Sequence, residues 1–166
     1  MKRFTAFIFF AYVLLSACRN PVEVPIPPFC DALVTDTTGT GDPGRVYMPN
    51  AFTPNNDGLN DISRPFTKNI ASIVFTIYDS GDAVMYTTSQ LNQGWQTTIA
   101  ASSYVKYHYR IQATTNNGRH IGQCGELYKL SCFPVNYPLS ALFFEDQLLP
   151  NGGFSGPTHE TMATCP

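Results

Sequence analysis

Three oxygen-bearing side chains in one short turn have the residue types and spacing of a cation site. Asn55, Asp57 and Asp61 stand at positions 3, 5 and 9 of a calcium-loop pattern, with a glycine at its sharp-turn position 6. However, position 1 would be Thr53 and position 12 would be Arg64, so the bidentate carboxylate of the pattern is missing. The sequence therefore favours a turn in which these side chains bind backbone amides, with a weak calcium loop as the alternative.

One cysteine has the setting of a lipid attachment site. Residues 15–18 read Leu-Ser-Ala-Cys, which resembles a bacterial lipobox, in which Cys18 is acylated and becomes the mature N-terminus. Each buried methylene of an attached lipid adds about 0.8 kcal/mol, so several chains hold a protein firmly in a membrane. A plain secretory signal is the alternative, but Leu15 stands where its cleavage site prefers a small residue.

The four other cysteines form an even set, which in an exported chain predicts two disulfides. Cys124 and Cys132 lie eight residues apart, which is about 26 Å if the segment is one strand. A disulfide needs Cα atoms about 4.4–6.8 Å apart, so we expect each of the two to bond a distant cysteine. Cys30 and Cys165 are those partners, in either order, and free buried thiols are the alternative.

No catalytic motif can be assembled from the remaining residues. His108, His120 and His159 share no metal-ligand spacing, and the chain has no phosphate-binding loop. Pro157 stands where a nucleophile elbow requires glycine. A net charge of −2 with only 13% charged residues gives no basic surface for nucleic acid. We therefore expect a protein that is not an enzyme and does not bind nucleic acid.

Two N-terminal segments precede the part of the chain that has the pattern of a folded domain. Residues 1–17 combine a basic start with a twelve-residue apolar span, which predicts a signal peptide. That span is too short for a membrane-spanning helix. Residues 18–45 are rich in proline and then in glycine and polar residues, which predicts a lipidated N-terminus and an extended tether.

Alternating apolar and polar residues predict short β-strands over residues 46–132. Residues 73–78 and 83–88 form the arms of a hairpin around an Asp-Ser-Gly-Asp turn. Residues 104–113 alternate most clearly, and an Asn-Asn-Gly turn leads from them to a last strand near residues 126–131. Short strands with turns between them predict an all-β fold, an antiparallel β-sandwich.

Aromatic residues on these strands allow two interpretations. Trp95, Tyr104, Tyr107 and Tyr109 could form a platform that stacks on a sugar. Because Tyr107 and Tyr109 alternate with charged residues, they are predicted to face the core, and we favour core packing.

Residues 133–166 form a C-terminal extension that we expect to pack on or beside the sandwich. Residues 138–149 fit a short helix, with proline in its first turn and Pro150 as its stop. They fit irregular chain equally well, pinned by Cys165 and packing Leu142, Phe143 and Phe144 on the sandwich. The sequence does not choose between these two.

Residues 46 to about 131 resemble a known family, the gliding-motility-associated C-terminal domain. This family is the type B sorting domain of proteins exported by the type IX secretion system of Bacteroidetes-type bacteria. The resemblance is carried by the run Pro-Asn-Ala-Phe-Thr-Pro-Asn-Asn-Asp-Gly-Leu-Asn-Asp at residues 49–61 and by four shorter matches, at residues 77–79, 94–95, 107–111 and 125–130. It implies an immunoglobulin-like sandwich that serves as an export and surface-attachment address.

Two departures from this family bear on function. Gln96 stands where the family usually has aspartate, and some 35 residues follow the sorting domain, which normally ends the chain. We therefore expect a lipid-anchored envelope protein with a structural or adhesive role, and a type IX sorting module as the alternative. The expected location is the outer membrane, with exposure at the cell surface. The expected partners are the membrane and an envelope protein, a secretion-machinery protein or a surface glycan.

Overall fold

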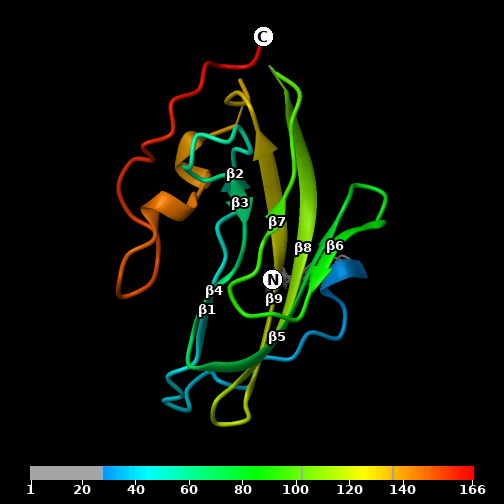
Figure 1. The fold of residues 1–166 in the computed structure, drawn as a ribbon. Helices are drawn as coiled ribbons and strands as arrows, with labels where there is room; N and C mark the ends of the chain where they lie inside the picture. Colours follow the sequence, from blue (N-terminus) through cyan, green and yellow to red (C-terminus); the bar gives the residue numbers. More distant parts are fainter. Residues whose placement is uncertain (1–27, 102, 136) are drawn as a thin grey trace, which may run out of the picture.

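The computed structural model describes residues 28–101, 103–135 and 137–166, and the fold is all-β, as predicted (Figure 1). Its largest element is a five-stranded sheet in the order β2–β9–β8–β5–β6. All neighbours pair antiparallel except β2 and β9, which are parallel, so the sheet is not purely antiparallel as expected. Its strands are β2 (Ala51–Phe52), β5 (Ile70–Tyr78), β6 (Val84–Thr88), β8 (Tyr104–Thr115) and β9 (His120–Leu130).

Two short strand pairs face one side of this sheet. The strands β1 (Arg45–Tyr47) and β4 (Phe66–Lys68) form one antiparallel pair. The strands β3 (Ile62–Ser63) and β7 (Trp95–Gln96) form the other. Gly94 makes the second pair feasible, because a Cβ atom there would lie 2.5 Å from Ile62 Cγ2 and 2.6 Å from the Ser63 carbonyl oxygen.

The main apolar core lies between the sheet and these short pairs. Alternate residues of β5 and β8 supply most of it, together with Phe52 of β2. Trp95 of β7 closes it from the side of the short pairs. Tyr107 and Tyr109 are buried there, which confirms the prediction of core packing, whereas Tyr104 is half exposed. Lys129 is the buried cation of this region, with Nζ 5.5 Å from the Trp95 ring and 5.4 Å from the Tyr107 ring. The fold therefore uses three of the four aromatic residues for packing.

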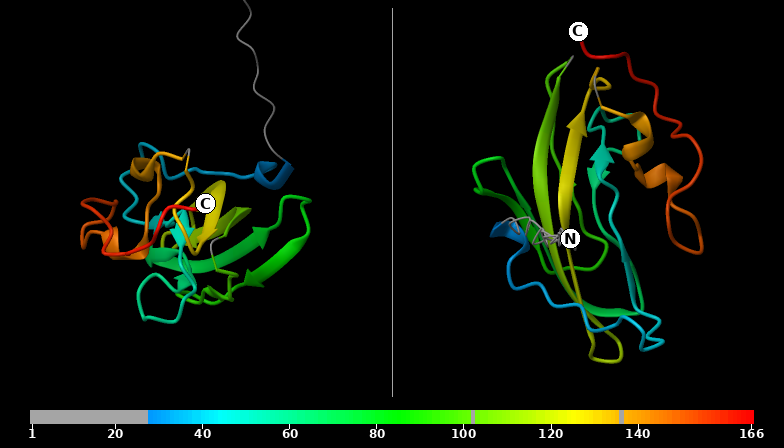
Figure 2. Two further views of the ribbon diagram at one scale, coloured as in Figure 1. Left: turned by 90° about the horizontal axis from the view of Figure 1, so that it is seen from above. Right: turned by 180° about the vertical axis from the view of Figure 1, so that it is seen from behind.

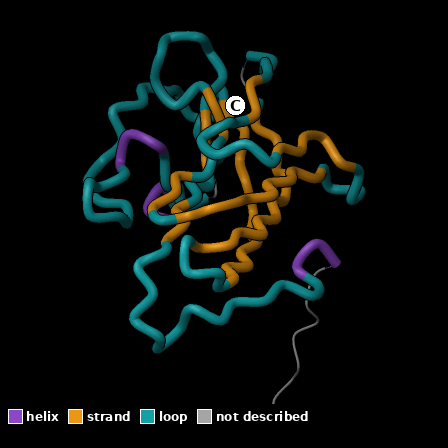
Figure 3. The backbone as a smooth tube through the Cα atoms, turned by 60° about the horizontal axis from the view of Figure 1, so that its bottom comes forward, coloured by secondary structure: helices purple, strands orange, loops and turns teal. Residues whose placement is uncertain are grey.

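The segment before β1 lies against the domain from residue 28 onward. A 3₁₀ turn, η1 (Pro28–Cys30), lies on the side of the strands opposite the other two 3₁₀ turns (Figure 3). Arg110 of β8 donates to the carbonyl oxygens of Phe29 and Asp31. Asp36 pairs with the backbone of His120 through two hydrogen bonds. Part of the predicted tether at 18–45 is thus bonded to the sheet, through residues 29, 31, 35, 36 and 42.

The C-terminal extension packs beside β2, at the edge of the sheet opposite β6 (Figures 1 and 2). It contains the 3₁₀ turns η2 (Leu139–Ala141) and η3 (Glu145–Gln147) and is otherwise irregular. Of the two alternatives for residues 138–149, the structure thus has irregular chain and not one continuous helix. Leu142 and Phe144 are buried against Tyr128 and Leu130, on the face of β9 that does not meet the main core. The end of β9 is therefore covered on both faces.

Two disulfides tie the flanking segments to this sheet. Cys30 bonds Cys124, so the N-terminal segment is fixed to β9. Cys132 bonds Cys165, so the extension is closed into a loop. This is one of the two pairings that strand spacing left open. Cys124 and Cys132 do not bond each other: Cys124 lies within β9, which continues to Leu130, and Cys132 follows the end of that strand.

Candidate functional site

The run at residues 49–61 divides into two sets of polar side chains. In the first set, Asn55 and Asp57 accept hydrogen bonds from the backbone amides two residues further on. Asp61 reaches back to the amides of Asn56 and Gly58, at 2.6 and 2.8 Å. Asn56, Gly58 and Asn60 all have positive φ, which asparagine and glycine adopt at low cost. This set builds the turn itself.

The geometry of this turn favours the amide-binding interpretation over a calcium loop. Oxygens of all three proposed ligands Asn55, Asp57 and Asp61 already accept hydrogen bonds from backbone amides. Within the described residues, no group of three or more histidine, cysteine, aspartate or glutamate side chains is arranged to hold a metal ion. The three side chains share a turn, but their bonds satisfy the backbone and not a cation.

The second set of polar side chains in the run faces the extension. Asn50 exchanges hydrogen bonds with the backbone of residues 141 and 143. Thr53 Oγ1 donates to Glu160 Oε2 at 2.6 Å, and Asn60 Nδ2 donates to the same oxygen at 3.1 Å. Asn60 also accepts from the Asp146 amide. The run that is most distinctive in the sequence is therefore the surface on which the extension docks.

Glu160 is the residue of this region that sequence reasoning missed. It lies 100 residues and more from its partners Thr53 and Asn60 along the chain, so no local spacing could reveal it. Its side chain is nearly buried, with 7% of the residue exposed. Glutamate is rarely buried without a partner, and among the described residues no cation forms an ion pair with it.

A pocket of about 540 Å³ opens beside Glu160, within the extension. Four phenylalanines from three parts of the extension line it: Phe133, the adjacent Phe143 and Phe144, and Phe154. The rings of Phe143 and Phe154 lie 5.5 Å apart, which is a normal separation for packed aromatic rings. A concave, mostly apolar site with few polar groups is typical of a small-ligand site.

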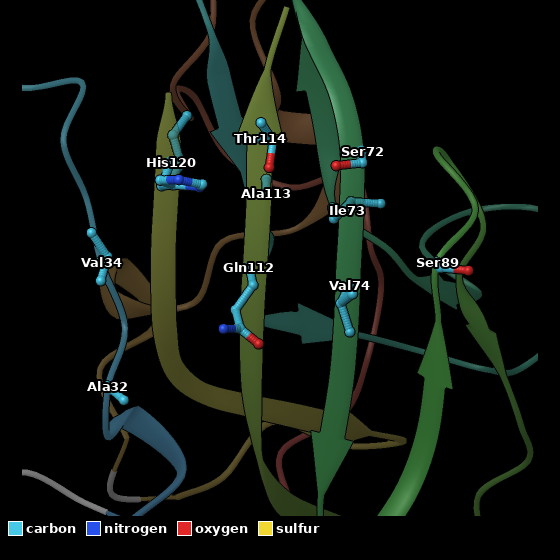
Figure 4. Close-up of a pocket in the computed structure, with 11 residues that line it drawn as sticks. Ala32, Val34, Ser72, Ile73, Val74, Ser89, Gln112, Ala113, Thr114 and His120 are labelled. Atoms are coloured by element: carbon cyan, nitrogen blue, oxygen red, sulfur yellow. The ribbon is translucent and has the colours of Figure 1, made fainter. Parts of the chain in front are cut away.

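A second hollow crosses the outer face of the sheet (Figure 4). It has a volume of about 530 Å³ and lies between the N-terminal segment at Val34 and the loop after β6 at Ser89. Its floor is formed by Val74, Gln112 and Thr114, with His120 at one side. The lining contains no aspartate, glutamate, lysine or arginine, so the hollow offers contact area without an acidic or strongly basic group to orient a ligand.

Asp42, Tyr128 and Glu126 have shifted pKa values with clear causes. The Gly44 amide, with Thr115 and Asn117, binds the carboxylate of Asp42 and lowers its pKa. Burial raises the pKa of Tyr128, and its hydrogen bond to Glu126 raises it further. That same bond lowers the pKa of Glu126. All three groups lie outside the pocket at Glu160.

Comparison of the chain with models of known families, with curated proteins and with solved structures found no match. The predicted lipidation site Cys18 and the predicted signal peptide at 1–17 lie outside the described residues. Among the described residues, no helix is long and apolar enough to cross a membrane.

Proposed function

We propose that this chain is a lipid-anchored cell-envelope protein with a structural or adhesive role and no catalytic activity. The pair of disulfides carries the proposal, because such bonds form in exported proteins and are rare in the cytosol. The lipobox-like residues 15–18 supply the anchor. The proposed location is the outer membrane, with the domain exposed at the cell surface.

The proposal includes an immunoglobulin-like sandwich over residues 46–132. It is supported by a five-stranded sheet that meets two short strand pairs across one apolar core. The N-terminal segment is part of the same folded unit through Cys30. Twelve residues then separate Cys18 from Cys30, and a chain of that length reaches at most about 40 Å. The domain would therefore stand close to the membrane that holds it.

Metabolic labelling with a clickable fatty acid tests the anchor. Cells that produce the full-length chain should give a labelled band, and a Cys18→Ala variant should give none. A Cys30→Ala variant is the matched control, because it also loses one cysteine but keeps the lipobox. Label that persists on Cys18→Ala would refute the anchor.

A type IX sorting module is the second candidate. The observation that favours it is the run at residues 49–61, together with the four shorter matches to the sorting-domain family. In this chain the run is hydrogen-bonded to the extension, which supports a binding domain that keeps the fold. Protease treatment of intact cells decides the matter. Surface exposure that is lost when the secretion machinery is deleted supports sorting, and unchanged exposure refutes it.

A further inference from the structure

We propose that the pocket beside Glu160 binds a small organic cation, an ammonium group carried on an apolar stem or ring. The inference rests on the proposed binding role of the domain but not on its lipid anchor. It starts from an imbalance of charge: residues 133–166 contain three acidic residues and no lysine or arginine. Two of the three already have a basic partner, since Glu145 pairs with Arg64 and Asp146 with His159. Glu160 is the acid of the extension that has none among the described residues.

The carboxylate of Glu160 is held in place with one oxygen unused. Thr53 and Asn60 both donate to Oε2, and no donor from the described residues reaches Oε1. Glu160 lines the pocket, and its Oε1 is not among the fully buried polar atoms of the described residues that lack a partner, so this oxygen keeps some exposure. A carboxylate accepts up to about four hydrogen bonds. A ligand N–H donor would therefore complete the set and neutralise a buried charge.

The remaining wall of the pocket suits the rest of such a ligand. Phe133, Phe143, Phe144 and Phe154 offer ring faces and edges, and aromatic faces attract cations as well as apolar groups. Gln147, which also lines the pocket, is already bonded to the backbone of residues 144 and 156. Glu160 is the charged residue of the lining, so it would orient a cationic ligand, and an anion would meet a carboxylate that has no basic partner. The volume of about 540 Å³ lies within the usual range for small-molecule sites.

Calorimetric titration of the full-length protein with 2-phenylethylamine tests this inference. This amine is cationic near pH 7, and 3-phenylpropanamide serves as a neutral probe of similar shape. We expect the amine to bind and the amide to bind at least about tenfold more weakly, because a charge-assisted hydrogen bond is lost. Nα-acetyl-lysine amide is the third probe, and it distinguishes a lysine side chain from a free aromatic amine as the natural source of the cation.

Glu160→Gln keeps the side-chain shape and an acceptor oxygen for Thr53 and Asn60, and should weaken amine binding about tenfold or more. Asp31→Asn is the matched control, because it removes the same charge from an exposed side chain on the N-terminal segment. If Glu160→Gln fails to fold, Phe154→Ala gives the second measurement and should weaken binding several-fold. Equal binding of amine and amide, no binding of either, or unchanged binding by the folded Glu160→Gln variant would overturn the inference. A chain that is acylated at Cys18 but binds no amine would overturn this inference alone.

Discussion

Replacing Glu160 with alanine should destabilise the whole domain, because this side chain joins the extension to the run at residues 49–61. The substitution removes two hydrogen bonds to a carboxylate, from Thr53 and Asn60, and each such bond contributes about 1.5–3 kcal/mol. The substitution also removes the cost of burying the carboxylate charge. The expected net loss in the free energy of unfolding is therefore about 3 kcal/mol. For a chain of this size, that loss lowers the melting temperature by about 10 °C.

Urea unfolding followed by the fluorescence of Trp95, the single tryptophan, measures this loss. The Glu160→Gln variant keeps an acceptor oxygen for Thr53 and Asn60, so its free energy of unfolding should fall by only about 1 kcal/mol. A double-mutant cycle with Thr53→Val should give a coupling energy of about 1–2 kcal/mol, because the two side chains are in direct contact. The exposed Asp31→Asn variant should lie within about 0.5 kcal/mol of the parent. If Glu160→Ala lowers the free energy of unfolding by less than about 0.5 kcal/mol, the hydrogen bonds of Glu160 to Thr53 and Asn60 do not hold the extension in place.

Four further outcomes follow from the structure. Replacing Cys132 and Cys165 with serine opens a loop closed over a separation of 33 residues, which should cost about 4 kcal/mol and expose the extension to limited proteolysis. Lys129→Ala should cost about 2 kcal/mol in urea unfolding, because it removes a buried stem and its contacts with two aromatic rings. Calcium should leave the melting temperature unchanged, since a ligand of the native state would have to raise it. The hydrogen bond from the Gly44 amide lowers the pKa of Asp42. The ionised carboxylate therefore contributes to the stability of the fold above about pH 3.8, and this contribution is lost as the pH falls through the lowered pKa. The difference in urea midpoint between the parent and Asp42→Asn should accordingly shrink from pH 5 to pH 2.5.

Local sequence patterns were sufficient to predict the longer strands. The alternation in residues 104–113 predicts a strand with one buried face, and in β8 alternate residues from Tyr107 onward are buried. The hairpin of β5 and β6 followed from its turn, in which Asp79 binds the amides of Gly81 and Ala83. These features depend on neighbours in the chain, so a single sequence contains the necessary information.

Contacts between distant segments were beyond the reach of such patterns. The N-terminal segment was predicted as an extended tether because proline and glycine dominate it, and the hydrogen bonds of Thr35 and Asp36 to the backbone of β9 were not predicted. The first half of β9 was missed for a related reason. Its residues include two glycines and weak alternation, and the strand is held by its pairing with β8. The position of Glu160 likewise depends on a loop that a disulfide closes. None of these contacts has a local signature.

Mass spectrometry of the mature protein isolated from the membrane of its producing cell tests the central claim most directly. The account predicts that the N-terminal peptide begins at Cys18 and has the added mass of attached acyl chains. A mature chain that begins elsewhere, or an unmodified Cys18 at its N-terminus, would contradict the proposal that this is a lipid-anchored envelope protein.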